Sequence, residues 1–274
     1  MRPLKGWKLA LVYSITVGML FMFLLPIVWT FFTSLKVNVD AWAMPPKWLF
    51  TPTFSNYGKV LVEKQFLRFS LNSAIVAVAS TIIALMLGSL TAYGLERFAV
   101  RGKEVIFFVF FWAYMVPAIV IALPLYLLAV EVRLLDTYTL LILSHASFNT
   151  AFATWMMRGF FQEVPREIEE CSLIDGCSHL GTLFRIVMPI AAPGLAVTSV
   201  FCLMYSWNDF PFALILAGFH TKTLPVAVGT LETPWGTFWG QVAASIFIGV
   251  LPIFVFTVLV QKWLVRGLSF GAIK

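Results

Sequence analysis

The residues best suited to chemistry lie in one polar segment, residues 158–189, of an otherwise apolar chain. Cys171, Cys177 and His179 are potential metal ligands there, but three ligands at this spacing match no common zinc pattern. We expect both cysteines to be small residues on a helix, and we predict no metal site. No nucleophile with a neighbouring base is apparent in the apolar stretches, so we expect no catalytic residues.

A phosphate-binding loop is not found in the sequence either. The dipeptides Gly58-Lys59 and Gly102-Lys103 are neither preceded by the spaced glycine of such a loop nor followed by Ser or Thr. The chain is therefore not expected to bind ATP in that manner. A pump made from it would need energy delivered across an interface with another protein.

The polar segment has the pattern of a helix, a turn and a second helix. Pro165 suits the first position of a helix, and Asp175-Gly176 ends that helix because glycine adopts a left-handed backbone that other residues resist. Ser178 is placed to cap a second helix, which Pro189 ends. Helical spacing gives the second helix a single apolar face made of Leu180, Leu183, Phe184, Val187 and Met188.

Composition places these features in a membrane protein. Hydrophobic residues make up 60% of the 274 residues, charged residues only 12%, and the mean hydropathy is +0.90. Several apolar stretches reach the roughly 20 residues that a helix needs to cross a bilayer. We predict an all-α polytopic fold, a single domain over residues 1–274, with six transmembrane helices. The spans are expected at residues 9–32, 71–95, 105–129, 138–157, 190–217 and 238–263.

Basic residues indicate how the spans are oriented. An even number of spans puts both termini on one side, and basic residues concentrate at the joints of that side, which makes it cytoplasmic. These residues are Arg2, Lys5, Lys8, Arg97, Arg101, Lys103, Arg158, Arg166, Arg185, Lys262, Arg266 and Lys274. We therefore expect the N-terminus and the tail at residues 264–274 to be cytoplasmic. Because the charges are scattered over helix ends rather than gathered in a stripe, we expect no nucleic-acid partner.

The spacing in the polar segment resembles the EAA loop of permease subunits in bacterial ATP-binding-cassette importers. Glu170 is followed by Gly176 six residues on, by Ile186 ten further and by Pro189 three further. Residues 92–98, 207–210 and 265–274 are also similar to sequences in the smaller permease of carbohydrate importers of the maltose-uptake type. The resemblance covers nearly the whole chain.

The resemblance implies that segment 158–189 docks ATPase subunits. The implied docking residues are Glu170, Cys171, Ser172, Asp175, Gly176, Phe184, Ile186 and Pro189. The family carries two alanines where this chain has Cys171 and Ser172. Both replacements are small, as a close-packed helical contact requires, so we expect docking to be kept.

The resemblance also implies the partners and the location of the chain. We expect a heterodimer with a second permease, two copies of a cytoplasmic ATPase that bind ATP and Mg, and an extracytoplasmic substrate-binding protein. The chain itself is expected to bind no cofactor, to be no enzyme and to lie among the lipids of the bacterial inner membrane, where it transports a sugar or related polyol. An ion-coupled secondary transporter of a small polar solute is the alternative, but no paired ionisable groups are apparent at membrane depth.

Four polar or aromatic residues inside the apolar stretches are candidates for the substrate path: Asn149, Trp207, Asn208 and Asp209. Trp207 offers an aromatic face on which sugars stack, and the carboxylate of Asp209 accepts hydroxyl protons. The same residues are equally compatible with packing. His145 and Asn149, four residues apart on one helix face, are more simply explained by interhelical hydrogen bonds.

Overall fold

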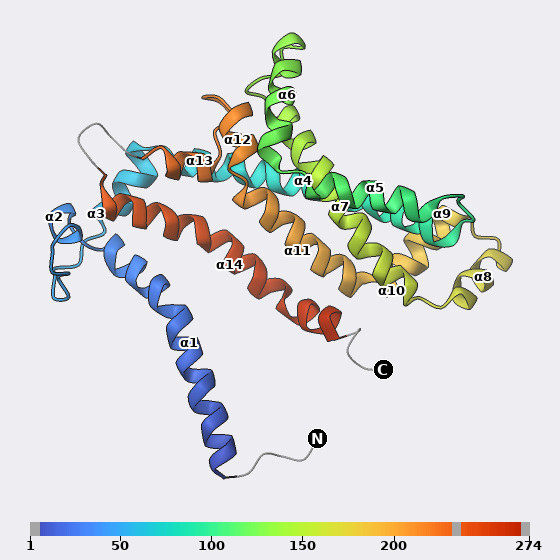
Figure 1. Cartoon of the computed structure of the whole chain (residues 1–274), viewed down its shortest axis with the longest axis horizontal. Coiled ribbons are helices and arrows are strands. Elements are labelled where there is room, and N and C mark those ends of the chain that lie inside the picture. The colour runs from blue at the N-terminus through green and yellow to red at the C-terminus, as the bar shows by residue number, and fades with distance from the viewer. Residues whose placement is uncertain (1–5, 232–236, 270–274) are drawn as a thin grey trace. The chain divides into compact units, whose positions relative to one another are not determined.

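The computed structural model describes residues 6–231 and 237–269, and in these ranges the chain is helical with connecting loops (Figure 1). The longer helices are α1 (Trp7–Ser34), α4 (Phe66–Arg97), α5 (Lys103–Met115), α6 (Ala118–Glu131), α7 (Tyr138–Gln162), α11 (Ala192–Asn208) and α14 (Trp239–Ser269). The shorter ones are α2 (Asn38–Ala41), α3 (Ser55–Gly58), α8 (Arg166–Ile174), α9 (His179–Thr182), α10 (Met188–Ile190), α12 (Pro211–Leu216), α13 (Leu224–Gly229) and the π-helical η1 (Lys59–Glu63) and η2 (Leu183–Val187). The all-α expectation is confirmed.

Three described helices are long and apolar enough to cross a membrane: α1, α4 and the Trp239–Lys262 part of α14. A fourth span results if the helical segment His179–Ile190 and α11, which meet at an 83° bend, are counted together. The count of six spans therefore stays a prediction. The tail expected at residues 264–274 begins as a continuation of α14 to Ser269, and residues 270–274 lie outside the described ranges.

Two of the predicted spans are wrong as continuous helices. The stretch 105–129 is interrupted where Val116 takes an extended backbone before Pro117, since a residue that precedes proline avoids the helical conformation. The stretch 190–217 is interrupted at Asp209, which is also extended and stands two residues before Pro211. Hydropathy averaged along the chain does not register such short breaks, because the segments that flank them are mostly apolar.

The described residues form two compact units. Unit 1 contains the described residues up to Leu67 and the segment Val228–Leu251, and unit 2 contains Arg68–Ala227 and the described residues from Pro252 onward. The single domain expected from the sequence stays a prediction.

In unit 1, the end of α1 is fixed to the segment that follows it. Asn56 Nδ2 donates to the carbonyl oxygens of Ser34 and Lys36, each at 2.8 Å, and Ser34 Oγ lies 2.7 Å from Tyr57 Oη. Gly240 of α14 lies so close that an added Cβ would be 2.6 Å from Asn56 Nδ2. Glycine is therefore required for α14 to approach this end of α1. The most apolar stretch of α1 is unburied, as expected of a helix that faces lipid or another subunit.

In unit 2, α4 and α7 approach each other closely. A Cβ on Gly88 of α4 would lie 2.6 Å from the Cβ of Ala153 on α7, so the contact has no room for a methyl group. Apolar side chains fill the space around both ends of α7. One cluster contains Val76, Leu140, Leu141, Phe148 and Phe212, and the other contains Tyr93, Met157, Phe161, Leu183 and Val187.

Hydrogen bonds join both of these helices to α11. Asn149 Nδ2 of α7 donates to the carbonyl oxygen of Cys202 at 3.0 Å and to Ser206 Oγ at 2.9 Å, both on α11. Ser206 Oγ in turn lies 2.9 Å from Ser80 Oγ on α4. The interhelical role expected of Asn149 is confirmed. Such bonds are favoured where lipid offers no competing water.

Just before the N-terminus of α7, Asp136 holds the loop between α12 and α13 in place. Its carboxylate accepts hydrogen bonds from the backbone N–H groups of Gly218, His220 and Thr221 at 2.9–3.0 Å and from Thr221 Oγ1 at 2.8 Å. Burial alone would raise the pKa of Asp136, but these hydrogen bonds outweigh it and lower the pKa to about 2. The stability that this carboxylate contributes is thus present above its ordinary pKa of 3.8 and is lost only as the pH falls towards 2.

Candidate functional site

The turn predicted at Gly176 exists. Gly176 has a φ of +89°, and nothing lies within 4 Å of where its Cβ would be, so glycine is required by the backbone and not by packing. Ser178 caps α9 by accepting the N–H of Gly181 at 3.1 Å, as expected. Helix α8 begins at Arg166, one residue after the predicted start at Pro165. We call α8, the turn at residues 175–178, α9 and the following η2 the elbow.

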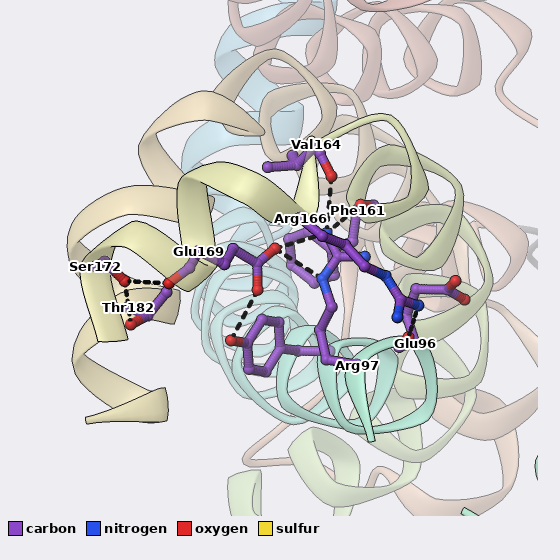
Figure 2. A network of polar contacts seen from close by, with 9 residues as sticks. Glu96, Arg97, Phe161, Val164, Arg166, Glu169, Ser172 and Thr182 are labelled. Atoms are coloured by element: carbon purple, nitrogen blue, oxygen red, sulfur yellow. Dashed lines mark hydrogen bonds and ion pairs between the residues drawn. The ribbon is translucent and has the colours of Figure 1, made fainter. Parts of the chain in front are cut away.

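A buried ion pair fixes the elbow to the end of α4. Glu169 of α8 accepts a hydrogen bond from Arg97 Nε at 2.7 Å, and Arg97 Nη2 lies 2.6 Å from the same carboxylate (Figure 2). Tyr93 Oη donates to the second oxygen of Glu169 at 3.1 Å. The side chains of Arg97 and Glu169 are over nine-tenths buried. Both oxygens of Glu169 are thus occupied, as a buried carboxylate requires.

Arg97 also binds the end of α7. Its Nη2 donates to the carbonyl oxygens of Phe161 at 2.7 Å and Val164 at 3.0 Å (Figure 2). The last carbonyls of a helix have no intrahelical partner, and a cationic side chain there also complements the helix dipole. One guanidinium therefore ties together the ends of α4 and α7 and the middle of α8.

Further contacts set the angle of the elbow and its connection to the helices. Ser172 Oγ of α8 lies 2.7 Å from Thr182 Oγ1 of α9, with both residues buried. Glu96, next to Arg97, accepts from Arg158 Nε at 3.2 Å, and its backbone oxygen accepts from Arg166 at 3.0 Å. The elbow is therefore held at both of its helices.

The structure shows where each predicted docking residue lies. Glu170, Cys171, Asp175, Gly176, Phe184 and Pro189 are exposed, Ile186 is half-buried, and Ser172 is buried. Within the described ranges the buried ion pair belongs to Glu169, and the neighbouring Glu170 forms none. A role for exposed Glu170 in docking stays a prediction.

The single apolar face predicted for the second helix is wrong. Leu183 and Val187 are fully buried against α4 and α7, whereas Leu180 and Phe184 point away and are exposed. The π-helical turn η2 widens the helix at residues 183–187 and so changes which side chains share a face. The exposed pair and Ile174, which is 85% exposed, leave an apolar surface on the outside of the elbow.

A cavity of about 460 Å³ in unit 2 brings together three of the four candidate substrate-path residues, Asn149, Asn208 and Asp209. Trp207 is buried and does not line it. The aromatic wall is instead made of Tyr114, Phe152, Phe201 and Tyr205. Helical periodicity could have found this, because positions 201, 204, 205 and 208 share a face of α11 that excludes position 207.

Beside this cavity lies a pair of ionisable groups that sequence analysis misses. His145 Nε2 of α7 is 3.2 Å from Asp209 Oδ2, and both side chains are almost fully buried. Asp209 Oδ2 also accepts the N–H of Ala213 at 3.1 Å and so caps the start of α12. The pair is formed by residues far apart in the sequence, and no local pattern points to it.

The ion pair leads to a prediction about the elbow. Glu169→Gln should lower the free energy of opening of the elbow by about 3 kcal/mol, because the guanidinium of Arg97 is left buried without its anion. Hydrogen exchange of residues 166–182 measures this as faster exchange. Glu170→Gln is the matched control: it removes the adjacent, exposed carboxylate and should leave exchange unchanged. Equal protection in the two variants would contradict the structural role of Glu169.

Comparison with known proteins identifies the family. Residues 84–270 match the model of a family described as binding-protein-dependent transport system inner membrane component. A probable ABC transporter permease protein, y4oR of Sinorhizobium fredii, is 34% identical over 93% of this chain and 91% of its own length. The trehalose transport system permease protein SugB of Mycobacterium tuberculosis is 31% identical over 92% of each chain.

A solved structure shares the fold. A chain of a bacterial ABC transporter involved in the import of the acidic polysaccharide alginate matches with a TM-score of 0.77 and 21% identity, covering 96% of this chain and 99% of that one. The relatives are named as permeases, and the expectation that this chain is not itself an enzyme is confirmed. The chain belongs to the family of inner membrane components of binding-protein-dependent transport systems.

Proposed function

We propose that this chain is one of two permeases of an ATP-driven importer for a sugar or related polyol. Relatives named for the transport of trehalose, diacetylchitobiose and sulfoquinovosyl glycerol support this class of solute. The second permease completes the pathway, an extracytoplasmic binding protein delivers the solute, and two copies of an ATPase bind ATP and Mg. The chain itself binds neither.

The observation that carries the proposal is the construction of the elbow. Its outer surface is exposed and partly apolar, with Ile174, Leu180 and Phe184 uncovered, while its inner surface is fixed to α4 and α7 through Arg97. An ATPase that binds the outer surface and moves would therefore move the helix ends with it. A mobile connector without the ion pair would absorb that movement.

The cavity of unit 2 suits a sugar. Its volume of about 460 Å³ falls within the range of small-molecule sites, roughly 300–1,000 Å³. Four aromatic side chains supply faces for stacking, and Asn149, Asn208 and Asp209 supply hydrogen-bonding groups. The lining residues in the described ranges include no Lys or Arg, which favours a neutral, hydroxyl-rich solute over an anionic one.

The proposed function also implies an orientation of the chain in the membrane. The ATPases are cytoplasmic, so the elbow is on the cytoplasmic side, and the basic residues at the joints support the same side for both termini. The loop held by Asp136 then lies on the opposite side, where the binding protein delivers the solute.

We expect Gly176→Leu to uncouple transport from ATP hydrolysis. A leucine at a φ of +89° is strained, so the turn must change and the outer surface of the elbow must shift. Solute uptake and solute-stimulated ATP hydrolysis in the reconstituted importer should both fall by about tenfold, a loss of roughly 1.4 kcal/mol of coupling. Gly159→Leu is the control, because Gly159 also has open space beside it but has a helical backbone. Normal coupling in Gly176→Leu would refute the docking role.

The cavity is tested through Asn208, which lines it and whose Nδ2 donates to the carbonyl oxygen of Met204. Asn208→Ala should raise the KM for uptake about fivefold through loss of one hydrogen bond to the solute, with basal ATP hydrolysis unchanged. Ser147 is the control: its Oγ likewise donates to a carbonyl oxygen of its own helix, but it does not line the cavity. Ser147→Ala should therefore leave KM unchanged. An unchanged KM in Asn208→Ala would show that Asn208 does not bind the solute.

Orientation is tested with reporter fusions. Fusions at Gly102, Arg166 and Lys274 should report a cytoplasmic location, and fusions at Thr53, Asp136 and Thr223 an external one. An external signal at Arg166 would place the elbow out of reach of any cytoplasmic ATPase. The docking proposal would then fail even though the family membership stands.

A further inference from the structure

Unit 1 contains a second pocket, of about 320 Å³, just beyond the end of α1. Three tryptophans line it, Trp29, Trp42 and Trp239, together with Lys36 and Asp40. None of these residues belongs to the elbow or to the cavity of unit 2. The combination of aromatic faces with one cation and one anion is the lining of a binding site rather than of a packing gap.

Lys36 is the unusual member of this lining. The residue is only 4% exposed, and its Nζ lies 5.0 Å from the ring centroid of Trp29 and 5.1 Å from that of Phe50. Within residues 6–231 and 237–269 it has no ion pair, since the carboxylate of Asp40 pairs with Lys47 Nζ at 2.8 Å. A buried ammonium has three N–H donors, and aromatic faces satisfy its charge only in part. An anion is therefore the missing partner.

The pocket lies where lipid headgroups are expected. Lys36 follows Ser34, the last residue of α1, by two positions, and α1 is one of the helices long and apolar enough to cross a membrane. Tryptophans concentrate at the boundary between lipid and water, and three of them surround this pocket. The apolar surface of α1 is uncovered in its most hydrophobic stretch and would accommodate acyl chains.

The pocket is also held in shape before any ligand arrives. Asn56 binds the carbonyl oxygen of Lys36, and Gly240 lets the start of α14 close on the same point. Trp42 Nε1 donates to the carbonyl oxygen of Thr237 at 3.1 Å, which fixes its ring at 6.0 Å from that of Trp239. A preformed site loses little conformational freedom on binding.

We propose that this pocket binds the headgroup of a membrane phospholipid of the phosphatidylethanolamine class. The phosphate pairs with the ammonium of Lys36, and the amine of the headgroup pairs with the carboxylate of Asp40 beside the ring of Trp42. Lys47 is exposed in its pair with Asp40, so this pair is screened by water and the lipid amine can replace it. Such a lipid would join the end of α1 to the bilayer independently of the solute that is transported.

The test is native mass spectrometry of the full chain in detergent, titrated with phosphatidylethanolamine. Lys36→Met should weaken binding at least about tenfold, because a charge-assisted contact is lost from a buried site. Lys59→Met removes an exposed lysine of the same unit and should bind like the unchanged protein. Lys36→Arg keeps the charge and should keep most of the affinity. The loss in Lys36→Met can then be assigned to the missing charge and not to a change in folding at this position. Unaltered binding in Lys36→Met would overturn the proposal.

The second half of the test concerns headgroup selectivity. Asp40→Asn should remove the preference for phosphatidylethanolamine over phosphatidylglycerol while leaving binding of the phosphate intact. Inorganic phosphate and a neutral disaccharide are the two soluble competitors. Binding of inorganic phosphate as tight as that of the lipid would assign the pocket to a free anion, and Lys36-dependent binding of the disaccharide without lipid binding would assign it to a sugar. Either result would overturn the lipid assignment without affecting the proposed transport function.

Discussion

The buried ion pair between Arg97 and Glu169 is the interaction on which the elbow end of unit 2 depends. Taking two charges out of water is costly, and here the cost is offset because Tyr93 and two helix-end carbonyls satisfy the remaining hydrogen-bonding groups. The pair joins the ends of α4 and α7 to α8, so the elbow has one defined position. Without it, the elbow would be held only by Arg166, by the contact of Ser172 with Thr182 and by apolar packing.

Local chemistry and long-range contacts differ in how well the sequence predicts them. The turn at Gly176, the cap at Ser178 and the all-α class depend on neighbouring residues, and all three are predicted. Glu169 and Glu170 are adjacent and chemically identical, and only the position of Arg97, 72 residues away, decides which one is buried. The pair of His145 with Asp209 is missed for the same reason. Trp207 does not line the cavity, and helical periodicity alone could have separated it from the lining residues.

The two breaks that sequence analysis misses have a common location. Ala118, which follows the break at Pro117, and Asp209 and Pro211, which form the other break, all line the cavity of unit 2. Backbone that leaves the helical pattern at membrane depth has unsatisfied polar groups, and it is tolerated where it borders a cavity rather than lipid. The capping of α12 by Asp209 satisfies part of this need, while the same carboxylate remains available at the cavity wall.

The close contact at Gly88 is expected to make α4 and α7 move together. With no space for even a methyl group between Gly88 and Ala153, the two helices cannot slide or rotate past each other without clashing, because packed interfaces change between discrete arrangements and do not deform smoothly. When the elbow is displaced, α7 is then expected to move with it as a rigid helix. We therefore expect the flexing of unit 2 at the interrupted helices, whose broken ends border its cavity.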